Sequence, residues 1–178
     1  FRAGDGGYPP VHLGDATLGF PTCWDQWFPE VARAYSLAGA EVLVYPTAIG
    51  SEPDHPGFDT EPLWERVITA NGIVNGTFMV VVNRVGTEGP LRFYGSSFVS
   101  DPYGRVLVQA PRDEPAVIVA DLDLAPPLDW LPLFPVPSTR PPAPSPHSTR
   151  PVTRPRPPTH RPPNRPPPTG RPRPPPPA

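Results

Sequence analysis

The chain has 178 residues, 35 of them proline, and a formal net charge of −2. This charge is the sum of two unequal parts, because residues 1–134 hold 7 arginines and all 17 acidic residues, whereas residues 135–178 hold 8 arginines and no acidic residue. A single cysteine excludes an internal disulfide and favours a reducing, cytoplasmic compartment, and no apolar run is long enough to span a membrane.

The two parts are expected to behave differently. Residues 1–134 carry all the aromatic side chains and are enough for one domain. Residues 135–178 contain 20 prolines and no aromatic residue, so they cannot bury enough apolar surface to offset the entropy of ordering. We therefore expect a folded domain over 1–134 and a disordered Pro/Arg-rich tail with polyproline II character over 135–178.

The first expected elements lead to the single cysteine, Cys23. Residues 12–22 are predicted to form one extended segment, in which Pro21 is unusual because proline cannot donate a hydrogen bond to a sheet. Residues 25–37 have the apolar spacing of a helix, and Gly39 is a natural stop. Cys23 is therefore expected where a strand meets a helix, where free backbone N–H groups can stabilise a thiolate or an oxyanion.

The elements that follow alternate between strand and helix. An almost continuously apolar strand is predicted at residues 41–46, followed by a loop rich in Pro, Gly and acidic residues. The later elements are a helix over 61–74 with Leu63, Val67, Ala70 and Val74 on its apolar face, a strand over 77–83, strands over 93–100 and 105–109 joined by a turn at 101–104, and a last strand over 115–121. This order predicts a mixed α/β layered domain.

Cys23 is open to two interpretations. A lone cysteine in an α/β domain is commonly a small buried apolar residue. A thiol between a strand and a helix, however, resembles the nucleophile turns of hydrolases. Trp24 and Trp27 are each commonly core residues when taken singly, so at this point the sequence leaves both interpretations open.

Several motifs, in order along the chain, are similar to those of the nitrilase superfamily of carbon–nitrogen hydrolases. They are CWDQWFPE at 23–30, YPTAIGSEP at 45–53, NRVG at 83–86 and FYGSSF at 93–98. The resemblance runs from about residue 4 to residue 124 and is closest to the N-carbamoylputrescine amidases. It implies a four-layer α-β-β-α sandwich, of which we expect this chain to form the C-terminal part, and an enzyme that hydrolyses linear carbon–nitrogen bonds.

The resemblance also implies a Glu–Lys–Cys triad that needs no metal and no other cofactor. Cys23 would be the nucleophile, and the backbone N–H of Trp24 would help a lysine to stabilise the oxyanion. In the family the glutamate and the lysine precede the cysteine, but the 22 residues before Cys23 contain no glutamate and the chain contains no lysine. Arginine is not an equivalent of lysine. We therefore expect the chain to be N-terminally incomplete, with an inactive remnant as the alternative.

Few residues bear on the substrate. In the related carbamoyl-amino-acid hydrolases two arginines hold the substrate carboxylate. Gln26 and Trp27 stand at those positions here, and an amide and an indole cannot replace the paired N–H groups of guanidinium, so a carboxylate-binding site is disfavoured. The acidic residues of loop 50–61 either attract a cationic amine or form a solvated loop. The resemblance therefore favours a carbamoyl amine such as N-carbamoylputrescine, in polyamine metabolism. The expected pocket residues are Gln26, Trp27, Thr47, Ala48 and Ile49.

The resemblance and the tail bear on partners. The family forms homo-oligomers, and we expect neither a membrane nor a nucleic acid as a partner of this chain. Pro-rich runs such as residues 155–158 and 171–177 fit the grooves of SH3- or WW-type modules. A Pro-rich interaction protein is thus a further alternative to the enzyme.

Overall fold

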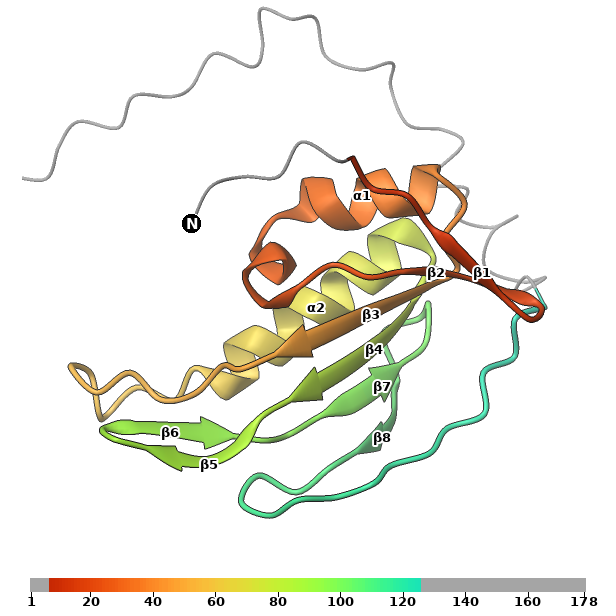
Figure 1. Ribbon diagram of the computed structural model, residues 1–178. Helices are drawn as coiled ribbons and strands as arrows, with labels where there is room; N and C mark the ends of the chain where they lie inside the picture. Colours follow the sequence, from red (N-terminus) through yellow and green to blue (C-terminus); the bar gives the residue numbers. More distant parts are fainter. Residues whose placement is uncertain (1–6, 126–178) are drawn as a thin grey trace, which may run out of the picture. The chain divides into compact units, whose positions relative to one another are not determined.

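The computed structural model describes residues 7–125 (Figure 1), so the predicted tail and the predicted domain boundary at residue 134 lie outside the described residues. The described part forms a mixed α/β fold, as the sequence predicts. Its elements are β1 Val11–Leu13, β2 Ala16–Gly19, the 3-10 helix η1 Cys23–Trp27, α1 Pro29–Leu37, β3 Val42–Thr47, α2 Glu61–Asn75, β4 Phe78–Asn83, β5 Val85–Glu88, β6 Leu91–Tyr94, β7 Phe98–Ser100 and β8 Val106–Gln109. Neither α1 nor α2 is both long and apolar enough to cross a membrane.

The larger sheet has the strand order β1-β2-β3-β4-β7-β8, and β5 and β6 form a separate hairpin. Strands β2, β3 and β4 are parallel, whereas the outer strands pair antiparallel. The β3–β4 register runs from Val42↔Phe78 to Thr47↔Asn83, so both strands end at the same level. The carboxyl ends of the parallel strands therefore share one edge of the sheet, on the left in Figure 1.

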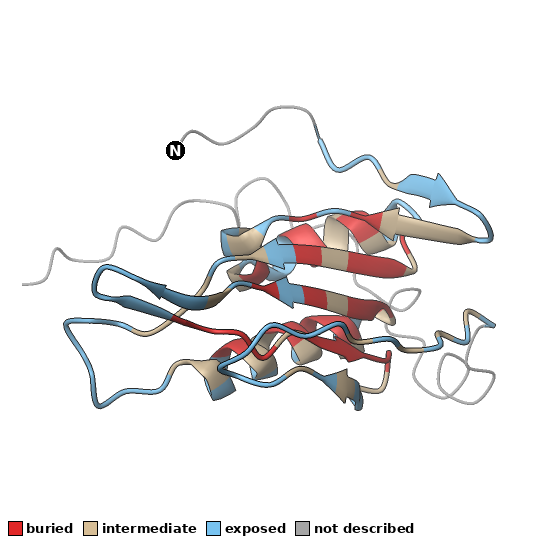
Figure 2. Ribbon diagram, turned by 60° about the horizontal axis from the view of Figure 1, so that its bottom comes forward, coloured by how far each residue is buried: buried red, intermediate tan, exposed pale blue. Residues whose placement is uncertain are grey.

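Both α-helices pack on one face of this sheet and enclose the core (Figure 1). The indole ring of Trp64, from α2, is fully buried and lies edge-on to Phe98 at a centroid distance of 5.5 Å. Figure 2 shows that burial is concentrated in the helices and the central strands. The buried core residues are Val31, Ala32, Tyr35, Ala40, Leu43, Tyr45, Trp64, Ile68, Met79, Val81, Tyr94 and Phe98.

The opposite face of the sheet is apolar and partly open. Because side chains alternate along a strand, Val80 and Val82 of β4 point away from the helices, whereas Met79 and Val81 point toward them. Val82 is 54% exposed. The described residues thus form one helical layer and one sheet layer, which is half of the four layers that the resemblance implies.

The predicted last strand, residues 115–121, is wrong as a sheet strand. No backbone–backbone hydrogen bond joins residues 113–125 to the rest of the described chain. Burial nevertheless alternates along the segment: Ile118 is half-buried, whereas Val117 and Val119 are 93% and 81% exposed. The segment therefore has the alternating burial of a strand, but the described residues offer it no neighbouring strand for a ladder.

Two predicted strands are each divided in the structure. The segment 12–22 contains the β1–β2 hairpin, which turns at Gly14 with a φ of +59°, and Pro21 lies beyond β2, outside the ladder. The segment 93–100 is broken by Gly95 and Ser96, which both have a φ of +54°. Its first part, β6, pairs with β5, which the sequence analysis missed.

The predicted helices also differ in detail. The single helix expected over 25–37 is η1 followed by α1, because Phe28 between them is extended. In α2 the predicted apolar face is only partly right: Val67 packs against the core, but Leu63 and Val74 are 50% and 41% exposed, whereas Trp64 and Ile68 are fully buried. The buried face is one residue further along the helix and includes polar Asn71, whose hydrogen bonds a count of apolar residues does not reveal.

Candidate active site

Three segments meet at the carboxyl edge of the parallel strands. After β2 the chain enters η1, which begins with Cys23; after β3 it enters residues 47–49; and β4 ends at Asn83. The carboxyl edge of parallel strands is where open α/β sheets bind their ligands. The fold therefore gathers the predicted nucleophile and three of the predicted pocket residues, Thr47, Ala48 and Ile49, along one edge.

Cys23 has an unusual backbone. Its φ is +39°, and the thiol is free and half-buried. A non-glycine residue in this region is strained, and such strain gathers at functional sites. The turn is closed by Asp25, whose backbone N–H donates to the carbonyl of Thr22 and whose carboxylate accepts the N–H of Thr22, both at 2.9 Å.

The helix that follows Cys23 differs from the expected one. Cys23 is the first residue of a five-residue 3-10 helix rather than a neighbour of an α-helix start. A helix this short has little macrodipole, so the positive end expected for the thiol is weak. The backbone N–H of Trp24 nevertheless lies in the first turn, where N–H groups have no acceptor within the helix. That N–H stays a candidate oxyanion donor.

Helix α2 fixes η1 in place through Gln26. The Gln26 side chain is fully buried and accepts a hydrogen bond from the indole N–H of Trp64 at 2.8 Å. The backbone carbonyl of Gln26 accepts a further bond from Asn71 at 3.1 Å. Gln26 thereby joins η1 to α2, and we give it a positioning role rather than a place on the substrate surface.

The two tryptophans of η1 lie in different surroundings. Trp27 is half-buried and packs against the core, whereas Trp24 is 67% exposed. Their rings meet edge-on with centroids 6.3 Å apart. The exposed Trp24 ring therefore offers an aromatic surface directly beside Cys23.

Residues 47–49 are held at both ends and exposed in the middle. The hydroxyl of Thr47 and the backbone N–H of Ile49 both donate to the side-chain oxygen of Asn83, each at 2.9 Å. Ile49 packs against the core, whereas Ala48 is exposed. In the sequence Asn83 is only the first residue of the NRVG motif, and that motif gives no sign of this role.

Tyr45 lies in the core of the same edge. Burial raises the pKa of the Tyr45 hydroxyl above its usual range, and the nearby Asp25 carboxylate raises it further. The hydroxyl has no hydrogen-bond partner among the described residues. Tyr45 is therefore a neutral phenol in the layer beneath η1.

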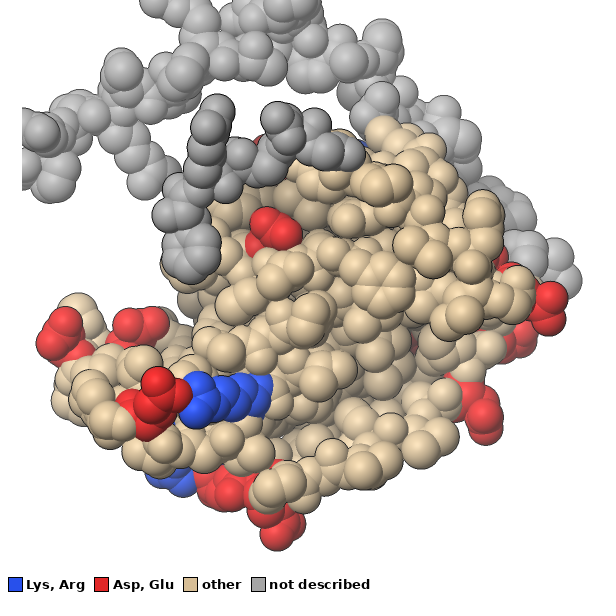
Figure 3. All heavy atoms as spheres, in the orientation of Figure 1, with Lys and Arg blue, Asp and Glu red and all other residues tan. Residues whose placement is uncertain are grey.

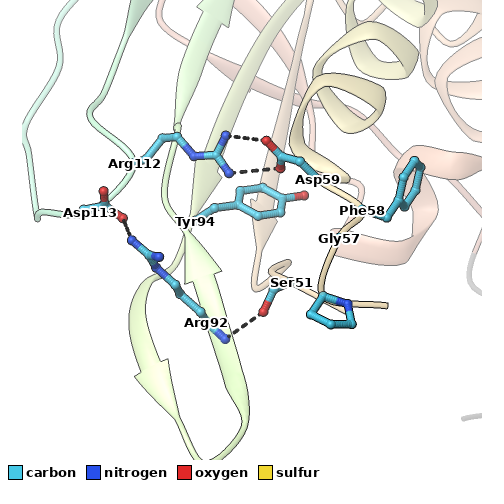
Figure 4. Close-up of a pocket in the computed structure, with 9 residues that line it drawn as sticks. Ser51, Gly57, Phe58, Asp59, Arg92, Tyr94, Arg112 and Asp113 are labelled. Atoms are coloured by element: carbon cyan, nitrogen blue, oxygen red, sulfur yellow. Dashed lines mark hydrogen bonds and ion pairs between the residues drawn. The ribbon is translucent and has the colours of Figure 1, made fainter. Parts of the chain in front are cut away.

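A cavity of about 330 Å³ opens beyond residue 50, between loop 51–59, β6 and the segment after β8 (Figure 4). Arg112 donates to both carboxylate oxygens of Asp59, at 2.8 and 3.0 Å, and lies 3.6 Å from Glu61. The bond to Arg112 lowers the pKa of Asp59, whereas burial raises the pKa of Glu61. Two of the acidic residues proposed to attract a cationic amine are thus paired with an arginine.

This cavity is distinct from the predicted site. Its lining includes neither Cys23 nor residues 47–49. Figure 3 shows charged side chains scattered around a largely uncharged surface on the side that it displays. Within residues 7–125, no three His, Cys, Asp or Glu side chains come together in a group that could hold a metal ion.

Comparison with known proteins agrees with the resemblance to carbon–nitrogen hydrolases. A family model described as carbon–nitrogen hydrolase matches residues 1–126. N-carbamoylputrescine amidase of Arabidopsis thaliana is 44% identical over 132 residues, covering 70% of this chain and 44% of the relative. Citrullinase of Francisella tularensis is 40% identical over 129 residues, covering 70% of this chain and 45% of the relative. The chain therefore spans less than half the length of these relatives.

Solved structures give the same fold. A carbon–nitrogen hydrolase from Helicobacter pylori G27 superposes with a TM-score of 0.71 at 34% identity, over 79% of this chain and 51% of the other. A mutant amidase from Nesterenkonia sp. AN1 superposes with a TM-score of 0.53 at 31% identity, over 64% of this chain and 40% of the other. That mutant shows covalent addition of the acetamide moiety of fluoroacetamide at its active-site cysteine.

Proposed function

This chain belongs to the carbon–nitrogen hydrolase family, and we propose that it supplies the nucleophile and one wall of the substrate site of an amidase acting on carbamoyl amines. The observation that carries the proposal is the backbone of Cys23, held at a φ of +39° at the carboxyl edge of the parallel strands. A buried structural cysteine can pack with an ordinary backbone conformation, whereas a nucleophile presented on a tight turn commonly has a strained one.

In the proposed reaction the sulfur of Cys23 attacks the carbonyl carbon of the ureido group. A carbon–sulfur bond forms, the bond from that carbon to the amine nitrogen breaks, and the amine leaves after taking up a proton. Water then adds to the same carbon and the carbon–sulfur bond breaks, which restores the thiol and releases carbamate, and the carbamate decomposes to ammonia and carbon dioxide. The backbone N–H of Trp24 stabilises the negative oxygen of each tetrahedral intermediate.

The choice of a carbamoyl amine rests on the names of the relatives and on charge. N-carbamoylputrescine and citrulline both end in a ureido group, but citrulline also carries a carboxylate. Gln26 and Trp27, at the positions of the carboxylate-binding arginines, are engaged with α2 and the core. The described residues carry 15 acidic side chains and 6 arginines, a balance that favours a cationic substrate.

The direct test is mass spectrometry of the full chain after incubation with N-carbamoylputrescine or with fluoroacetamide. We expect a mass increase on the peptide that contains Cys23 and none in Cys23→Ala. Labelling that is equally fast in protein unfolded with urea would show that the fold does not activate the thiol, and would overturn the proposal.

A second candidate is a protein that binds such compounds without turnover. These 178 residues contain no lysine, so any turnover by this chain on its own must proceed without a lysine side chain. Release of ammonia from N-carbamoylputrescine separates the two. A Cys23 adduct with ammonia release supports the enzyme, whereas an adduct that persists without ammonia supports the second candidate.

A further inference from the structure

We propose that Asn83 is the positioning residue of the substrate site: it fixes residues 47–49 so that the exposed Ala48 between them meets the amide or ureido group of the substrate. This inference rests on the proposed function for the identity of the ligand. The contacts of Asn83 themselves come from the structure alone.

The Asn83 side chain uses its whole hydrogen-bonding capacity. Its oxygen accepts from the hydroxyl of Thr47 and from the N–H of Ile49, both at 2.9 Å. Its nitrogen donates to the carbonyls of Ile49 and Gly95, at 3.0 and 2.9 Å. Only 8% of the residue is exposed, so water cannot readily replace these partners.

The chemistry of the partners fixes the orientation of the amide. The backbone N–H of Ile49 can only donate, so it must face the side-chain oxygen of Asn83. The carbonyls of Ile49 and Gly95 can only accept, so they must face the nitrogen. Aspartate has nearly the same shape but would set a carboxylate oxygen against two carbonyls, so an amide is required at this position.

The same side chain joins segments that are distant in the sequence. Asn83 ends β4, Ile49 follows β3 and lies 34 residues away, and Gly95 precedes β7. Ser97 completes the junction by accepting the backbone N–H of Asn83 at 2.9 Å. The hydrogen bonds of Asn83 thus hold the loop after β3 against the end of β4 and the segment that precedes β7.

What the junction leaves unpaired is Ala48. The carbonyl of Thr47 accepts the backbone N–H of Arg84, and both backbone groups of Ile49 are bonded to Asn83. In contrast, neither backbone group of the exposed Ala48 has a hydrogen-bond partner within the described part of the chain. One donor and one acceptor are therefore presented at the same strand edge as Cys23, and an amide or ureido group offers the matching acceptor and donor.

The test compares two reagents that modify the thiol of Cys23. Iodoacetamide carries an amide group and reacts as the sulfur forms a bond to carbon and iodide leaves. Methyl methanethiosulfonate carries no amide group and reacts as the sulfur forms a disulfide and methanesulfinate leaves. The rate with iodoacetamide is divided by the rate with methyl methanethiosulfonate, and this ratio is divided by the same ratio for glutathione. The result measures the preference of the site for an amide, and it does not change when the thiol merely becomes more or less exposed.

We expect this amide preference to fall about tenfold in Asn83→Asp and Asn83→Ala, because small displacements of a binding group have large effects on rate. Thr47→Val removes one of the four bonds, retains the shape of the residue and should lower the preference less. The matched control is Asn75→Asp, because Asn75 is also buried and donates its amide at 2.8 Å, but to Asn71 within α2. It should leave the preference unchanged.

Amide hydrogen exchange at Ile49, followed by NMR in the full chain, gives a second readout. Protection of this N–H should be lost in Asn83→Ala and retained in Asn75→Asp. Unchanged protection and unchanged preference in folded Asn83 variants, or an equal loss in Asn75→Asp, would overturn the inference. If the wild-type chain showed no amide preference at all, the proposed function and the substrate role of Asn83 would fail, while Ile49 exchange would still decide whether Asn83 fixes the loop.

Discussion

Gly50 follows the proposed substrate loop directly, and the structure predicts a large cost for Gly50→Ala. A Cβ built at this position lies 2.4 Å from the backbone oxygen of Arg92 and 2.9 Å from the Cα of Phe93. Ordinary carbon–oxygen contacts begin at about 3.3 Å, so the backbone at Gly50 and strand β6 must separate by about 0.9 Å. The obstacle is backbone, which cannot rotate away as the end of a side chain can.

The magnitude follows from two contributions. Overpacking of this kind costs about 1–3 kcal/mol. This separation also lengthens the hydrogen bond that the N–H of Ser51 donates to the carbonyl of Arg92, now 2.8 Å, and its loss costs a further 0.5–1.5 kcal/mol or so. We therefore expect Gly50→Ala to lower the free energy of unfolding by about 2–4 kcal/mol.

Urea unfolding of the full chain, followed by tryptophan fluorescence, measures this loss. The control is Gly57→Ala in the same loop, where nothing lies within 4 Å of the added Cβ. That change should be neutral or stabilise by up to about 1 kcal/mol. A Gly50→Ala variant as stable as wild type, or a Gly57→Ala variant equally destabilised, would refute the packing that holds loop 50–60 against β6.

Three further changes test other parts of the structure. Gln26→Met leaves the indole N–H of Trp64 without its acceptor but also removes the amide nitrogen of Gln26, which is buried without a partner, so it should lower the free energy of unfolding by only about 1 kcal/mol in the same assay. Arg112→Gln should raise the pKa of Asp59 toward its ordinary value in an NMR titration of the carboxyl group. Because the pair lowers that pKa, its stabilisation is present above pH 3.8 and is lost as the pH falls through the lowered pKa, so the variant and the wild type should converge in acid. Val82→Asp, on the open sheet face, should reduce binding of the dye ANS by the full chain while changing stability less than Gly50→Ala.

The sequence predicts those parts of the fold that depend on local patterns. Strands β3 and β4 are short apolar runs bounded by turn residues, and α2 has a clear helical period. The β7–β8 turn was also predicted, from the sequence Asp-Pro-Tyr-Gly at 101–104. In the structure Gly104 adopts a φ of +79°, and the carboxylate of Asp101 accepts the N–H groups of Tyr103 and Arg105. In each case the residues that determine the structure lie within a few positions of one another.

Predictions failed where the outcome depends on distant partners. Strand β5 has a weak pattern of its own and exists as the partner of β6. The segment 115–121 has the pattern of a strand, but the described residues give it no ladder. Asn83 shows the same limit for the site, because the hydrogen bonds that define its role reach residues 34 and 12 positions away.

The buried amides at the carboxyl edge favour a functional interpretation of that edge over a purely structural one. A buried amide contributes little net stability even when fully bonded, and an apolar residue of similar volume would serve packing as well. Gln26 and Asn83 nevertheless stand at this edge, one fixing the helix that starts with Cys23 and the other fixing the loop after β3. Hydrogen bonds are directional, whereas apolar contacts permit sliding, so these amides give the two segments defined positions rather than additional stability. Defined positions are what a strained nucleophile and a substrate loop require from the sheet beneath them.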